Sequence, residues 1–463
     1  MKTICRCLAL LTALCLLLFA CCACGKEKDA GAAQGTYLST DGEVPSVYQV
    51  PGGVFKYFYK IFLNTYADEL QGTYGFDTAR SAKEQSYNGE TYYELIKRQV
   101  KEQLSRVWLL YADAREQGMT LTEAEQALLE QQVKNRASLQ DRDITEEDIR
   151  QALQITFLAQ KYERGEYAKK AFDDAAVYTR LEENPIPYQY YGCYCISLFY
   201  GASPDAANPN GLTVQRVEEL TAQLLAAATQ EEFERIASVY IREYQPSLNE
   251  TGVANQLANF YQDQVCYTDD SVGAWAFAGE REAGDTYCVD DEANACKHVF
   301  FLTALPHLDE SYTANIRQVL FAAEQGDRTE AEFDALLQEQ EQKARDMLLE
   351  FEKEPTEKHF AALAAQTGEA DSGELLTDVS AGQLPQALDA WCLDPARRAG
   401  DVAVIQSEYG WHAVYYVSRG EQMWRLSVLN DLTAEKIENR LQVLKSRYSV
   451  AYNDELYDAM SGL

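Results

Sequence analysis

The stretch "AWCLDPARRAGDVAVIQSEYGWHAVYYVS", residues 390–418, has a diverged copy earlier in the chain, "AWAFAGEREAGDTYCVDDEANACKHVFFLT", at 274–303. The first part of each copy aligns without a gap, and the two share Ala, Trp, Arg, Ala, Gly and Asp at equivalent places. After a gap of two residues, His298 aligns with His412, and each His precedes an apolar run. Since the chain holds only 4 His, the match indicates an internal repeat, which decides the fold prediction.

The chain on either side of the repeat divides into regions of different pattern. From about residue 53 to 180, apolar side chains recur every three or four positions, which predicts amphipathic helices. The sequence NPIPYQ at 184–189 interrupts this pattern, and strand-like segments follow at 190–200 and 315–321. Each repeat is then expected to run strand, helix, loop, helix, strand, strand. The predicted fold class is α+β.

With 463 residues, the chain is too long for a single core, so several domains are expected. The changes in pattern predict a lipoprotein signal peptide at 1–24, a flexible tether at 25–45, a helical domain at 46–185, a first repeat at 186–305, a second repeat at 312–420 and a C-terminal helix at 421–463.

The N-terminal leader has the features of an export signal. Lys2 and Arg6 precede the apolar run LALLTALCLLLFA, which is shorter than the roughly 20 residues that a membrane-spanning helix needs. The following LFACCACGK resembles the lipobox of bacterial lipoproteins. Cys21 is the expected lipidation site and Cys24 is the alternative. The protein is therefore expected at the extracytoplasmic face of the cell membrane, held by a lipid anchor.

Charge and cysteine content exclude some partners and cofactors. The net charge of −32 repels nucleic acid, so no nucleic-acid partner is expected. No cysteine spacing is typical of a zinc or redox site, and we expect no metal and no cofactor. A disulfide across a predicted hairpin, between Cys288 and Cys296, is geometrically possible, but the pairing stays open among the cysteines outside the leader, which are Cys193, Cys195, Cys266, Cys288, Cys296 and Cys392.

The second repeat carries a series of short motifs in a fixed order. They are RQVL at 317–320, FAALA at 360–364, SGEL at 372–375, GQL at 382–384, GDV at 400–402 and YGWHAV at 409–414. This series resembles the parvulin family of peptidyl-prolyl isomerases. The order of leader, helical domain and two such repeats resembles the PrsA/SurA-type foldases of the bacterial envelope. That resemblance implies a SurA-N-like helical chaperone domain, with the C-terminal helix packing back on it.

The chemistry of prolyl isomerisation indicates which residues matter. Rotation about an X–Pro bond crosses a barrier of about 18–20 kcal/mol but breaks no bond, so neither a nucleophile nor a metal is required. The catalyst needs an apolar pocket for the proline ring and polar groups near the carbonyl. The resemblance implies that the polar groups are His412, Gln318 and Asp371, and that the substrate contacts are Leu384, Leu388, Trp391 and Tyr409.

One departure from the family pattern leaves the activity open. Gln318 stands where the family has a His, and Gln can form hydrogen bonds but cannot titrate. In the first repeat we expect Ile196 at this strand position and no catalysis. Each assignment also has a structural alternative: His412 as a core residue of a hairpin, Trp391 as plain core, and Asp371 as a turn residue.

Three functions are compatible with these features. The first is an isomerase that acts on X–Pro bonds of unfolded or nascent secreted polypeptides. The second is a holdase, a chaperone that binds such chains through its apolar surfaces without turnover. The third is a solute-binding lipoprotein, which would need two similar lobes around a polar cleft rather than a long helical domain at its start.

Overall fold

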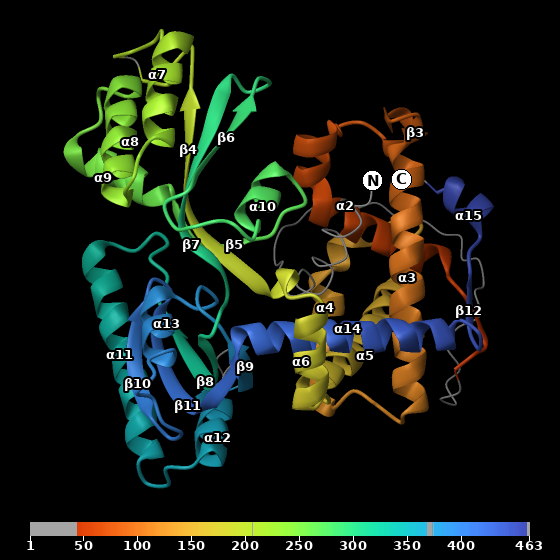
Figure 1. The fold of residues 1–463 in the computed structure, drawn as a ribbon. Coiled ribbons are helices and arrows are strands. Elements are labelled where there is room, and N and C mark those ends of the chain that lie inside the picture. The colour runs from red at the N-terminus through yellow and green to blue at the C-terminus, as the bar shows by residue number, and fades with distance from the viewer. Residues whose placement is uncertain (1–43, 206, 368–372, 374, 461–463) are drawn as a thin grey trace. The chain divides into compact units, whose positions relative to one another are not determined.

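The computed structural model describes residues 44–205, 207–367, 373 and 375–460, and the chain divides into two compact units (Figure 1). Unit 1 comprises Met1–Ala171 and Asn430–Leu463, and unit 2 comprises Phe172–Leu429. Helices and mainly antiparallel sheets make up the described chain, which gives an α+β fold. No helix among these residues is both long enough and apolar enough to cross a membrane. Cys21 and Cys24 lie outside the described residues.

Unit 1 is a helical domain with short strands at its edges. Its helices begin where the sequence places capping residues: Thr122 and Glu125 form one capping box, and Thr145 and Asp148 form another. The elements are β1 (Val47–Gln49), α2 (Gly52–Tyr74), β2 (Ser86–Tyr87), β3 (Glu90–Thr91), α3 (Tyr92–Glu116), α4 (Glu123–Asn135), α5 (Glu146–Lys169), β12 (Ser449–Ala451), α15 (Asp454–Asp458) and the later part of α14 (Met423–Leu444).

The C-terminal part of the chain completes the core of unit 1. Strand β12 pairs in parallel with β1, and Ile437 and Leu441 of α14 are buried in the same cluster as the side chains of α3 and α5. Arg440 binds the fully buried carboxylate of Asp113 through two hydrogen bonds of 2.6 and 3.0 Å. A buried charge needs such a partner, so this pair ties α14 to α3.

Unit 2 starts earlier than the pattern change at 184–189 predicts. Helix α6 (Asp174–Glu183) belongs to it, although the expected helical domain ran to residue 185. The reason is a contact with the first turn of α14, where the Tyr178 ring lies 5.7 Å from the Trp424 ring. Arg425 of the same turn also pairs with Asp174 at 2.6 Å.

The rest of unit 2 consists of two four-stranded antiparallel sheets with the same topology. The first repeat has the order β5-β4-β7-β6, and the second, counted from its opposite edge, has β9-β8-β11-β10. The first contains β4 (Gln189–Phe199), α7 (Val214–Leu225), α8 (Gln230–Tyr244), α9 (Glu250–Asn259), β5 (Tyr261–Cys266), α10 (Ser271–Ala276), β6 (Thr286–Asp291) and β7 (Cys296–Leu308). The second contains β8 (Tyr312–Ala322), α11 (Glu330–Phe351), α12 (Glu357–Thr367), β9 (Leu375–Val379), α13 (Gln386–Cys392), β10 (Val402–Ser407) and β11 (Gly410–Gln422).

The two histidines occupy equivalent places in these sheets. His298 lies opposite Val289 in the β6–β7 hairpin, and His412 lies opposite Ile405 in the β10–β11 hairpin. The two-residue gap in the alignment is a difference in loop length, since the last paired residues are Asp291 with Cys296 in one hairpin and Ser407 with Gly410 in the other.

Each sheet buries its two faces in separate clusters. Alternate strand residues pack under long helices, as Ile196 does with Phe233 of α8 and Val319 does with Phe360 of α12. The opposite faces pack against the short helices α10 and α13. Figure 1 shows α7 and α8 beside the first sheet and α11 and α12 in the second repeat. Both histidines belong to the face that the short helices cover.

The register corrects two expectations. His298 pairs with Ser197 and His412 pairs with Leu320, so the residue equivalent to Gln318 is Cys195 rather than Ile196. Cys288 packs on the face under the long helices, whereas Cys296 lies on the opposite face, and both thiols are free. The disulfide between Cys288 and Cys296 that the sequence left possible is therefore not formed, because the sheet separates the two sulfur atoms.

Candidate functional site

The second repeat brings His412 and Gln318 into direct contact. The two residues come from adjacent strands, β11 and β8, and point to the same face because their cross-strand partners are two positions apart. His412 Nδ1 lies 3.1 Å from Gln318 Oε1. Since the amide oxygen only accepts, this bond places the ring proton on Nδ1. The sequence motifs thus identified two side chains that meet in space.

Ser407 completes the surroundings of the His412 ring. Its Oγ lies 2.7 Å from Nε2, and it also accepts a hydrogen bond of 3.1 Å from the Tyr409 backbone N–H. With the proton on Nδ1, Nε2 accepts from the Ser407 hydroxyl. The ring is therefore fixed from both sides in one tautomer. The sequence motifs did not identify Ser407. Its position two residues after Ile405, on the same face of the predicted strand, was the available indication that it lies beside His412.

Burial decides the charge of His412. The residue is only 3% exposed, and this burial lowers its pKa to about 4, while Glu408 acts weakly in the opposite direction. The imidazole is therefore neutral at pH 7. It can donate one hydrogen bond and accept one, but it supplies no positive charge. This suits a site that orients polar groups without transferring a proton.

The three predicted apolar contacts lie on the same face of the sheet. Leu388 of α13 is fully buried in a cluster with Ile316 and Val414, and Leu384 and Trp391 pack against that cluster while staying half-buried. We call Leu384, Leu388 and Trp391 the apolar shelf. Because Leu388 is covered, only the other two shelf residues offer surface to a ligand.

Two further predicted residues are less connected to this group. Tyr409 lies in the turn between β10 and β11 with a 57% exposed side chain, so it stands at the surface rather than on the shelf. Asp371 lies outside the described residues. Gly373 stands two positions after Asp371, and the Gly373 N–H donates a 2.8 Å hydrogen bond to the backbone carbonyl of Gln318.

Two hollows lie in the first repeat. One has a volume of about 560 Å³ and is lined mainly by apolar groups, among them Phe199, Tyr240 and Tyr244. The other has about 640 Å³ and is lined in part by Tyr190, His307 and Asp309. Neither was expected from the sequence, since their lining residues come from several elements.

Comparisons of the chain with protein-family models and with curated protein sequences give no match. The His412–Gln318–Ser407 group and the apolar shelf combine a fixed polar group with apolar surface on one face of the second sheet.

Proposed function

We propose that the protein is a membrane-anchored extracytoplasmic foldase of the PrsA/SurA type, whose second repeat acts on X–Pro bonds of unfolded secreted polypeptides. The observation that carries the proposal is the His412–Gln318 hydrogen bond beside the apolar shelf. An X–Pro bond rotates more easily where its proline ring sits in an apolar site and its carbonyl meets oriented polar groups. Leu384 and Trp391 would contact the ring.

The helical domain and the first repeat are proposed to bind client chains. The resemblance to SurA-N-like and parvulin-like domains supports this role, and so does the apolar hollow beside Tyr240 and Tyr244. Unfolded chains present apolar side chains and unpaired backbone, which such surfaces can bind. The lipid anchor at Cys21, or at Cys24, is proposed from the leader sequence alone.

A holdase without turnover is the second candidate, and two observations favour it. Gln318 replaces a titratable residue, and Leu388, the central member of the shelf, is fully buried. A site with less accessible apolar surface holds a proline ring less tightly, yet peptide binding by the remaining surface would persist. The two candidates differ in whether the protein changes the rate of isomerisation.

An isomerisation assay on proline-containing tetrapeptides separates them. For an isomerase, the protein without its leader speeds the reaction above the buffer rate, His412→Ala abolishes the gain and Gln318→His increases it. His359→Ala is the control, because His359 is on α12 and bonds to the Glu354 carbonyl instead of the site. A buffer rate for both the unaltered protein and Gln318→His would exclude the enzyme.

Suppression of the aggregation of a reduced client protein tests the holdase. Leu384→Asp places a charge on the half-buried shelf and is expected to weaken suppression. Leu349→Asp is the matched control, since Leu349 is a 59% exposed leucine on α11. No suppression by the unaltered protein at stoichiometric excess, or equal loss in both variants, would contradict peptide binding through the shelf.

A further inference from the structure

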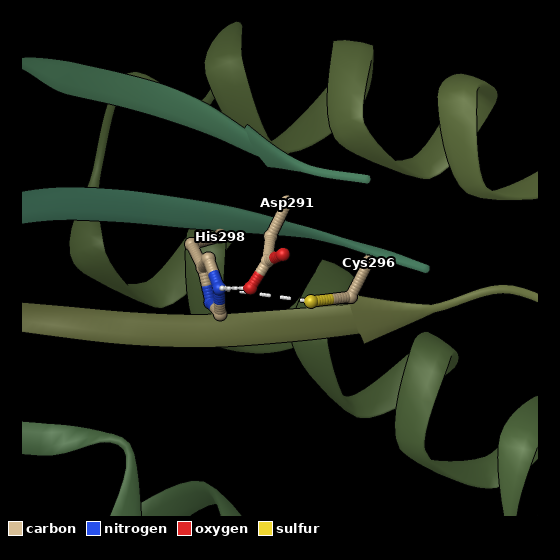
Figure 2. Close-up of side chains that lie close together, drawn as sticks. All are labelled: Asp291, Cys296 and His298. Carbon is tan, nitrogen blue, oxygen red and sulfur yellow. Dashed lines mark hydrogen bonds and ion pairs between the residues drawn. The ribbon is translucent and has the colours of Figure 1, made fainter. Parts of the chain in front are cut away.

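Three potential metal ligands converge in the β6–β7 hairpin of the first repeat. Asp291 ends β6, and Cys296 and His298 lie two positions apart on β7, so all three point to one face (Figure 2). Their ligand atoms lie within 4.8 Å of one another. His298 Nε2 is 3.4 Å from Asp291 Oδ2 and 3.6 Å from Cys296 Sγ.

The two separations from His298 Nε2 match the edges of a tetrahedral zinc site. Zinc binds sulfur at about 2.3 Å and imidazole nitrogen or carboxylate oxygen at about 2.0–2.2 Å, so neighbouring ligand atoms lie about 3.3–3.6 Å apart. Both measured distances from His298 Nε2 fall in this range. One thiol, one imidazole and one carboxylate also form a donor set that suits zinc.

The direction of the contacts separates a metal site from a catalytic Cys–His–Asp relay. In a relay, the thiol and the carboxylate bond to different nitrogens of the imidazole ring. Here Cys296 and Asp291 both approach Nε2, while Nδ1 lies 2.8 Å from the Ser197 hydroxyl. A thiol and a carboxylate that approach the same imidazole nitrogen suit a shared metal ion, and a hydrogen-bonded second nitrogen is typical of a metal-binding histidine.

We propose that Asp291, Cys296 and His298 bind one zinc ion, with the fourth coordination position open to water. Ser197 would orient the His298 ring through Nδ1. The site is reachable, because the His298 and Asp291 side chains are 30% and 26% exposed. Binding replaces the thiol proton of Cys296, which passes to solvent, by the metal–sulfur bond.

Charge supports this assignment. A divalent cation would neutralise Asp291 and stabilise the thiolate. Zinc affinity should therefore increase with pH as the thiol proton becomes easier to remove.

Titration with zinc and with cobalt tests the site. We expect the full mature chain, treated with a chelator and a phosphine reductant, to bind one ion per chain. Its cobalt form should show a thiolate-to-metal charge-transfer band and the strong visible bands of tetrahedral coordination. Cys296→Ser should lose the charge-transfer band, and Asp291→Asn and His298→Gln should lose tight binding. Ser197→Ala should weaken binding by about 10–100-fold, as for other partners of metal-bound histidines.

Cys288→Ser is the matched control, since Cys288 lies in the same hairpin on the opposite face. It should bind zinc like the unaltered chain. Circular dichroism of each metal-free variant shows whether it is folded, and zinc should raise the melting temperature of the unaltered chain but not of Cys296→Ser. A charge-transfer band that survives Cys296→Ser, or no one-to-one binding by the unaltered chain, would overturn the assignment.

Discussion

The β6–β7 hairpin and the β10–β11 hairpin carry a histidine at the same register, but the two rings have different neighbours. His412 is buried between Ser407 and Gln318, two neutral groups. His298 is 30% exposed and meets a carboxylate and a thiol. By register, Asp291 takes the place of Ser407 and Cys296 takes that of Gly410. Changes on both strands beside one retained residue, including Cys195 and Ser197 in place of Gln318 and Leu320, thus separate a neutral hydrogen-bonded site from the proposed metal ligands.

The opposite face of each sheet explains why such divergence is tolerated. Ile196 and Val319 are equivalent and fully buried, as are Val299 and Ala413 and the helix residues Phe233 and Phe360. Burial of apolar surface supplies most of the free energy of folding. The buried apolar face under the long helices therefore maintains the topology, and the polar groups on the face with the histidines can change without loss of the fold.

The largest expected effect is the loss of the aromatic residue under each sheet. Phe233→Ala and Phe360→Ala each remove a fully buried ring and should cost about 3–5 kcal/mol. Amide hydrogen exchange checks where the loss occurs. Phe233→Ala should reduce protection in β7 and spare β11, and Phe360→Ala should do the reverse. Equal loss in both sheets from either change would mean that the repeats unfold as one cooperative unit.

The buried histidine should make the second repeat sensitive to acid. Its folded pKa is about 4 against an ordinary 6.5, so the unfolded chain binds the proton first. The contribution of the neutral ring to the free energy of unfolding is complete above pH 6.5. It falls by a total of about 3 kcal/mol as the pH drops to 4, and it does not change further below that pH. Denaturant titrations of the unaltered chain and of His412→Gln should differ by this amount across the window. A difference that does not vary with pH would show that the ring is solvated.

The sequence predicted the fold class and the repeat because both depend on local pattern. Helical periodicity between residues 53 and 180 and the capping boxes at Thr122 and Thr145 located helices directly. The aligned Trp275 and Trp391 lie on the short helices α10 and α13, which cover equivalent faces of the two sheets. The helical domain was expected to run to residue 185, but α6 packs through Tyr178 onto Trp424, a contact between distant residues that no local pattern shows.

The site was predictable only where a motif covered it. His412 and Gln318 stood in motifs, and the structure brings them together. Ser407 and the Asp291–Cys296–His298 group were missed because their contacts depend on hairpin register. The equivalence of Ile196 with Gln318 failed for the same reason, since a shift of one residue exchanges the two faces of a strand. A Cys and a His two positions apart on a predicted strand were the available indication of the metal ligands.

After the buried phenylalanines and the acid effect on His412, the next largest expected loss of stability comes from removal of the serine beside His412. Ser407→Ala leaves the buried Nε2 without its donor and should destabilise the second repeat by about 1–3 kcal/mol. Ser197→Ala in the first repeat is the comparison, and without metal it should cost less, because His298 can bond to water. Denaturant titration of both variants measures the difference. Equal costs would mean that the two rings are equally well solvated, contrary to their exposed fractions.

The smallest expected effect concerns the charged pair next to the metal ligands. Lys297 pairs with Asp290 across the β6–β7 hairpin, while the equivalent residues of the other hairpin, Trp411 and Gln406, carry no charge. Lys297→Ala should change the free energy of unfolding by less than about 1 kcal/mol, and added salt should remove the difference. A larger effect that persists at high salt would show that the lysine stem packs against the first sheet, so that this hairpin, like β10–β11, is stabilised by apolar contact rather than by charge.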